Sequence, residues 1–110
     1  MKETQLGELE ELILLAILSE GNKAHGLAIQ EKLLLDINRK ISRGSLHTVL
    51  ARLEEKAYLT SAKSDPTPTR GGKSKRVYSV SNAGMGALSY AKTIRDRYYK
   101  TIPVFQFSWG

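Results

Sequence analysis

The chain has 110 residues, of which 41% are hydrophobic, and its 17 Lys and Arg against 11 Asp and Glu give a formal net charge of +6. This length fits one domain with one core, and the hydrophobic share argues against a disordered chain. The positive charge favours an anionic partner, either a nucleic acid or an acidic membrane surface. The absence of cysteine excludes disulfides, thiolate metal sites and cysteine catalysis.

The N-terminal segment is acidic, whereas a secretory signal begins with basic residues. The longest apolar run, residues 12–18, has seven residues, and a membrane-spanning helix needs about 20. We therefore expect a cytoplasmic protein that has no membrane partner.

Positive charge is concentrated in two central segments. Residues 39–56 carry five Lys and Arg against two Glu, and residues 63–76 carry five against one Asp, whereas residues 1–20 have a net charge of −4. A single basic run is as often a solvated surface as a binding site. Two basic runs on neighbouring elements favour nucleic-acid binding.

Two helices are predicted in the first 40 residues. Apolar residues recur at helical spacing over residues 6–18, and Gly21 is a natural left-handed stop. A second helix is expected over residues 24–35, followed by a polar turn over residues 36–40. Its core candidates are Leu27, Ile29, Leu33 and Leu34.

The third predicted helix is capped by Ser42 and carries one apolar stripe, formed by Leu46, Val49, Leu50 and Leu53. Its opposite face has mostly small residues, with polar and basic residues on both edges. Such a face allows a helix to enter the major groove of DNA and to contact base edges. The residues of this face and its edges are Gly44, Ser45, His47, Thr48, Ala51, Arg52 and Glu55.

A β-hairpin and a last helix follow. Residues 58–63 and 76–80 are rich in residues that favour strands, and the connecting segment 64–75 has two Pro, two Gly and no apolar residue. This loop is too long for a tight turn, and its basic end is Arg70, Lys73, Lys75 and Arg76. Ser81 is the expected cap of a final helix that Pro103 stops, and residues 104–110 form an aromatic tail.

In this order, the elements resemble the PadR family of bacterial transcription regulators over about residues 6–100. Two positions depart from the family pattern: His47 stands where Tyr is common, and Ala57, which disfavours a left-handed turn, stands where Gly is common. The motifs that carry the resemblance are residues 6–15, 25–29, 42–47 and 50–56, and residues 76–81 followed by Ala83 and Gly84.

The resemblance implies a mainly α winged helix-turn-helix protein with a small β-hairpin. It would have a three-helix core and a wing in residues 1–81, and a C-terminal dimerisation helix with the aromatic tail in residues 82–110. It also implies a homodimer that binds a palindromic operator in double-stranded DNA, usually as a repressor. Small ligands relieve repression in some relatives.

Two sets of site residues follow from this combined interpretation. The helix and wing are expected to contact bases and phosphates, with Ser42 serving mainly as a cap. The last helix is expected to pair with its copy in a partner. The DNA-binding set is Ser42, Arg43, Ser45, His47, Thr48, Arg52, Arg70, Lys73, Lys75 and Arg76, and the dimerisation set is Leu88, Ala91, Ile94, Tyr98, Tyr99 and Ile102.

Several alternatives compete with this hypothesis. Aromatic residues of the last helix and tail either seal the dimer or line a pocket for a flat apolar effector, and we favour the seal. The main rival function is that of a winged helix that binds only proteins. RNA binding would need exposed aromatic side chains for base stacking outside the last helix and the tail. We expect no enzyme, no cofactor and no metal site, because His25 and His47 have no carboxylate or cysteine at a catalytic or metal-binding spacing.

Overall fold

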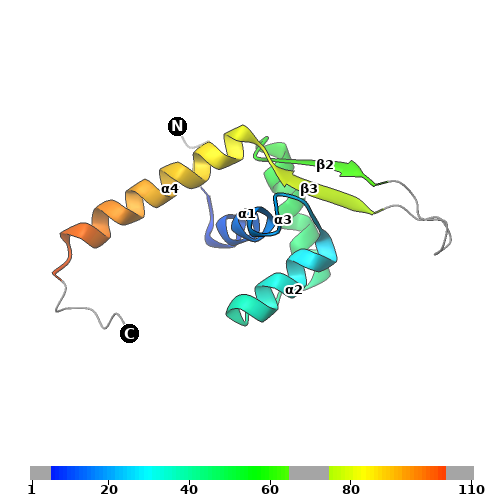
Figure 1. Ribbon diagram of the computed structural model, residues 1–110, viewed down its shortest axis with the longest axis horizontal. Helices are drawn as coiled ribbons and strands as arrows, with labels where there is room; N and C mark the ends of the chain where they lie inside the picture. Colours follow the sequence, from blue (N-terminus) through cyan, green and yellow to red (C-terminus); the bar gives the residue numbers. More distant parts are fainter. Residues whose placement is uncertain (1–5, 65–74, 104–110) are drawn as a thin grey trace.

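The computed structural model describes residues 6–64 and 75–103. Figure 1 shows α1 in the middle of the molecule, the hairpin β2–β3 extending to one side and α4 to the other. The predicted mainly α fold with a small hairpin is confirmed. The elements are α1 (Glu8–Ser19), β1 (Ala24–His25), α2 (Gly26–Ile37), α3 (Arg43–Glu55), β2 (Leu59–Lys63), β3 (Arg76–Val80) and α4 (Asn82–Thr101).

Helix α1 forms the centre of the core. Ile13, Leu14 and Ile17 are completely inaccessible to solvent, and α1 contacts α2, α3, α4 and β3. The helix ends where Gly21 adopts a left-handed conformation with a φ of 81°, as the sequence predicts. The amide side chain of Asn22 then donates to the carbonyl of Val80 at 3.3 Å and accepts from its N–H at 2.7 Å, which fixes this turn against β3.

The start of the second helix was predicted incorrectly. Ala24 and His25 form the strand β1, which pairs with Tyr78 and Val77 of β3 and gives an antiparallel sheet of order β1-β3-β2. Two residues are too few to show a strand period, so the pairing depends on a partner more than 50 positions away.

Helix α2 therefore begins at Gly26 and continues to Ile37. Of its expected core residues, Ile29 and Leu33 are buried, whereas Leu27 and Leu34 are 52% and 45% exposed, so those two assignments were wrong. The helix ends at Asn38, which is left-handed with a φ of 54°.

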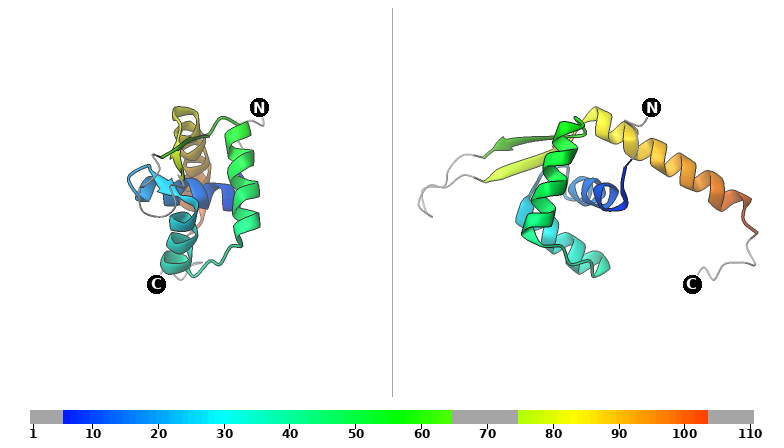
Figure 2. Two further views of the ribbon diagram at one scale, coloured as in Figure 1. Left: turned by 90° about the vertical axis from the view of Figure 1, so that its right-hand side faces the viewer. Right: turned by 180° about the vertical axis from the view of Figure 1, so that it is seen from behind.

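Helix α3 forms as the sequence predicts. The Oγ of Ser42 accepts a hydrogen bond from the N–H of Ser45 at 3.0 Å, so Ser42 is the N-cap. All four residues of the predicted apolar stripe are buried. In the view from behind in Figure 2, α3 lies in front of α1 and extends from the base of the hairpin to α2.

The turn from α3 into β2 contains a left-handed residue, Ala57, with a φ of 65°. The sequence argued against such a turn at an alanine, and the structure contradicts that expectation. The chain reverses here because the N–H of Ala57 donates to the carbonyl of Glu54 at 2.9 Å and that of Tyr58 donates to the carbonyl of Leu53 at 3.0 Å. These hydrogen bonds, and the hydroxyl of Ser81, which donates to the carbonyl of Ala57 at 2.7 Å, hold this exposed residue in a conformation that its side chain disfavours.

Strands β2 and β3 pair from Leu59 with Val80 to Lys63 with Arg76. Ser81 then caps α4, because its Oγ accepts from the N–H of Gly84 at 3.1 Å. Only residues in the first two turns of α4 are buried, namely Gly84, Ala87 and Leu88. The rest of α4 runs away from the core (Figure 1).

Candidate nucleic-acid interface

The outward face of α3 is open to solvent along its whole length. The predicted contact residues Arg43, Ser45, His47, Thr48 and Arg52 are all exposed. The hydroxyl of Thr48 donates to the carbonyl of Gly44 at 3.0 Å, which leaves its methyl group and an oxygen lone pair at the surface. The face therefore combines short side chains with two guanidinium groups and one imidazole.

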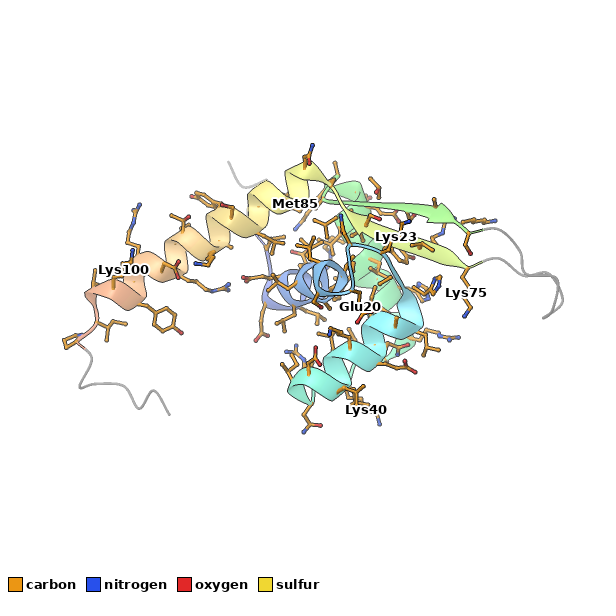
Figure 3. All side chains as sticks on the ribbon, viewed as in Figure 1. Glu20, Lys23, Lys40, Lys75, Met85 and Lys100 are labelled. Carbon is orange, nitrogen blue, oxygen red and sulfur yellow. The ribbon has the colours of Figure 1, made fainter. Side chains whose placement is uncertain are left out.

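A groove of about 560 Å³ lies between α2, α3 and the loop end of the hairpin. Four predicted contact residues line it: Arg43 and His47 from α3, and Lys75 and Arg76 from the start of β3. The fold thus brings residues that are about 30 positions apart to one surface. Figure 3 shows Lys75 at the end of β3 that is farthest from α4.

Other predicted contact residues lie beside this groove or outside the described residues. Ser45, Thr48 and Arg52 are exposed on α3 but do not line the groove. Arg70 and Lys73 lie in the segment 65–74, outside the described residues, so their predicted role remains a prediction.

The groove also has lining residues that the sequence did not point to, namely His25 of β1 and Gln30 and Glu31 of α2. Gln30 donates through its Nε2 to the carbonyl of Ile41 at 2.9 Å, which fixes the turn between α2 and α3. Glu31 places a carboxylate among the basic side chains. In a helix-turn-helix motif, the start of the first helix lies next to the second helix. The predicted pair of helices was therefore the sequence signal that could have identified these groove residues.

The hairpin is joined to the end of α3 by a short polar network. The hydroxyl of Ser61 donates to Oε2 of Glu54 at 2.6 Å, and a terminal nitrogen of Arg76 donates to Oγ of Ser61 at 2.8 Å. Burial raises the pKa of Tyr78 above its ordinary value, the negative charge of Glu54 raises it further, and Arg76 opposes this shift. The charges of Glu54 and Arg76 therefore have opposite effects on Tyr78, which also lines the groove.

The acidic start of α1 pairs with basic residues from three other parts of the chain. Glu8 is 3.5 Å from Arg39, Glu10 is 2.9 Å from Lys56, and Glu11 pairs with Arg95 of α4. The negative charge of the N-terminal segment is therefore compensated by ion pairs within the molecule.

The predicted dimerisation residues lie on α4 with unequal exposure. Leu88 is 8% exposed and belongs to the core of its own chain, which leaves little of it for a partner. Ala91 and Ile102 are half-buried. Ile94, Tyr98 and Tyr99 are 37%, 68% and 51% exposed. Lys100 marks this far end of α4 in Figure 3, away from the groove.

Within residues 6–64 and 75–103, no three His, Cys, Asp or Glu side chains converge on a position that would hold a metal ion. In the same residues, no helix has both the length and the apolar character that crossing a membrane requires.

The fold is shared with solved structures of transcription regulators and of a winged-helix DNA-binding protein. A PadR family transcription regulator from Clostridium difficile R20291 is 22% identical, with a TM-score of 0.71 over 92% of this chain and 100% of that one. A transcriptional regulator from Clostridium thermocellum is 22% identical, with a TM-score of 0.60 over 83% of each chain. F93 from STIV, a winged-helix DNA-binding protein, is 15% identical, with a TM-score of 0.64 over 91% of this chain and 98% of that one.

None of the curated proteins matches this sequence. The model of the transcriptional regulator PadR-like family matches residues 14–90, which is more than half of the chain. This match confirms the resemblance and the prediction of a regulator that is not an enzyme. The chain belongs to the PadR-like family of transcriptional regulators.

Proposed function

We propose that the chain binds double-stranded DNA in a sequence-specific manner through α3 and the hairpin. The observation that carries this proposal is the groove that Arg43 and His47 of α3 line together with Lys75 and Arg76, where β3 begins. A capped helix with a small, exposed outer face fits the major groove, which is about 12 Å wide. A basic hairpin beside it supplies contacts to phosphates.

The side chains divide into two roles. Arg43, Ser45, His47 and Thr48 lie near the start or middle of α3, where a recognition helix contacts base edges. Lys75 and Arg76, together with the predicted Arg70 and Lys73, contact phosphates, and Arg52 contacts the backbone near the end of the helix. Phosphate contacts set affinity and register, whereas base contacts set the sequence.

The functional unit of this proposal is a homodimer. The outer half of α4 exposes Ile94 and Tyr98, and Leu15 of α1 is also 46% exposed. Pairing around a twofold axis would remove this apolar surface from water. Two copies of α3 must then lie about one DNA turn apart, roughly 34 Å, which requires a palindromic operator.

We further propose that the dimer acts as a repressor in the cytoplasm, as the family resemblance implies. Tyr90 and Tyr98 are exposed on α4, and we favour a role for them in sealing the dimer over a role in binding an apolar effector. A protein-binding module is the weaker candidate, because the outer face of α3 lacks the large apolar side chains that anchor protein interfaces.

The test is selection of bound duplexes from a random pool, followed by salt titration of the selected site. The selected sequences should be palindromic. Lys75→Ala should reduce the slope of log affinity against log salt by about 1.8, because the dimer loses one phosphate contact from each protomer. Lys100→Ala removes the same charge from the far end of α4 and should leave the slope unchanged. Failure to select any duplex would contradict DNA binding and favour the protein-binding alternative.

A further inference from the structure

We propose that Ser61 is a positioning residue that holds the guanidinium of Arg76 in place for DNA binding. This inference rests on the proposed function of the groove. Three elements meet in the contact: Glu54 lies in the last turn of α3, Ser61 in the middle of β2 and Arg76 at the start of β3.

The register of the hairpin places these groups on one face of the sheet. Ser61 is paired with Tyr78, and Arg76 precedes Tyr78 by two positions, so all three side chains lie on the same face. That face is directed toward α3, since Ser61 reaches Glu54 at 2.6 Å. Arg76 and Tyr78 also line the basic groove.

The chemistry of the three groups fixes the direction of both hydrogen bonds. A carboxylate only accepts and a guanidinium only donates, so neither can be reversed. A hydroxyl has one proton and two lone pairs, and it can therefore donate to Glu54 while it accepts from Arg76 at 2.8 Å. An alanine at position 61 would break both bonds at once, whereas a threonine would keep the hydroxyl.

This network orders the Arg76 side chain in the folded protein. Part of the conformational entropy of that side chain is therefore lost on folding and does not have to be lost on DNA binding. Immobilising such a side chain in an interface typically weakens binding by about 3- to 10-fold when the ordering has to occur on association. The network also keeps the Glu54 carboxylate next to a cation, which reduces its repulsion of nearby phosphates.

The experiment compares Ser61→Ala and Ser61→Thr on the selected duplex, with thermal unfolding of each variant measured alongside. Ser61→Ala should weaken binding of the dimer by about 10- to 100-fold, since both protomers are affected, with an unchanged salt slope, because the charge of Arg76 is retained. Ser61→Thr should restore wild-type affinity. Thr60→Ala, on the opposite face of the same strand, is the matched control and should bind as the wild type does.

A double-mutant cycle tests whether Ser61 acts through Arg76. In an Arg76→Ala background, Ser61→Ala should have no further effect on affinity, and full additivity would overturn the proposal. In the free protein, NMR of the Arg76 side chain should show restricted motion that Ser61→Ala releases. Wild-type affinity of Ser61→Ala would overturn this inference alone, whereas failure of the unmutated chain to bind any duplex would overturn the proposed function as well.

Discussion

The carboxylate of Glu10 and the ammonium group of Lys56 join α1 to the end of α3. The Nζ of Lys56 lies 3.0 and 2.9 Å from the two carboxylate oxygens, and the N–H of Gly7 donates to Glu10 at 2.8 Å. Glu10 is 5% exposed as a residue, whereas the side chain of Lys56 is 33% exposed. The two partners therefore differ in their access to water, although both take part in the same ion pair.

This difference predicts an unequal response to mutation. Lys56→Met leaves a buried carboxylate without its counter-ion and should cost about 3 kcal/mol of the free energy of unfolding. Glu10→Gln keeps a neutral acceptor and leaves an ammonium group that reaches water, so it should cost about 1 kcal/mol. Denaturant unfolding of both variants checks the order, and a larger loss for Glu10→Gln would contradict it.

Ala57 is predicted to be a site of stored backbone strain. A left-handed conformation costs a non-glycine residue about 1–2 kcal/mol, and glycine recovers most of this at an entropic cost of about 0.5–1 kcal/mol. Ala57→Gly should therefore stabilise the protein by about 0.5 kcal/mol. The same substitution at Ala51, an exposed residue in the middle of α3, should destabilise it by about 1 kcal/mol. Thermal unfolding distinguishes these opposite signs.

Gly84 is predicted to tolerate no side chain. A Cβ at this position would lie 2.3 Å from the carbonyl oxygen of Tyr58 and 2.8 Å from Cγ1 of Val80, so Gly84→Ala should cost about 2 kcal/mol or more. At Gly86, in the same helix, a Cβ would meet nothing within 4 Å of the described structure. Gly86→Ala should therefore stabilise the protein by about 0.5–1 kcal/mol. Equal effects at the two positions would rule out close packing as the cause.

Tyr78 is predicted to contribute to a loss of stability at alkaline pH. Because its pKa is raised in the folded protein, the folded state holds the phenol proton more tightly than the unfolded state does. The resulting stability is complete below about pH 10, the ordinary tyrosine value, and is lost as the pH rises through the folded pKa. Melting temperatures measured across this range should fall less steeply for Tyr78→Phe. An unchanged pH profile would exclude this contribution.

Ile94 is predicted to lie in the dimer interface. Ile94→Asp would place a carboxylate in the proposed interface and should give a monomer at concentrations where the wild type is a dimer. Leu35→Asp introduces the same group on α2, at a residue that is 82% exposed and lies outside the predicted interface, and it should leave the dimer intact. Sedimentation of both variants is the measurement. Dimers of unchanged stability for Ile94→Asp would move the interface away from this part of α4.

Sequence reasoning was most reliable where a structure depends on neighbouring residues. The cap at Ser42 and the buried stripe of α3 involve residues at most seven positions apart, so the pattern contains the whole interaction. The same holds for the cap at Ser81, and the strand β3 was predicted with its correct bounds. The exposed face of α3 followed from its buried face, because a helix period fixes both.

Contacts between distant segments were decided only by the tertiary structure. β1 exists because β3 pairs with it, and Lys56 lies 46 positions from the carboxylate that it neutralises. The left-handed Ala57 opposes its local preference, and its carbonyl is held by the hydroxyl of Ser81, 24 positions away. The groove gains His25 of β1 and Glu31 of α2 because the fold places these elements beside α3. Residue order determined the helices, the hairpin and the family of this protein. The tertiary structure decided which charged residues form ion pairs and which apolar residues of α2 stay exposed. The physical reason is that residues far apart along the chain can lie next to each other once the chain is packed.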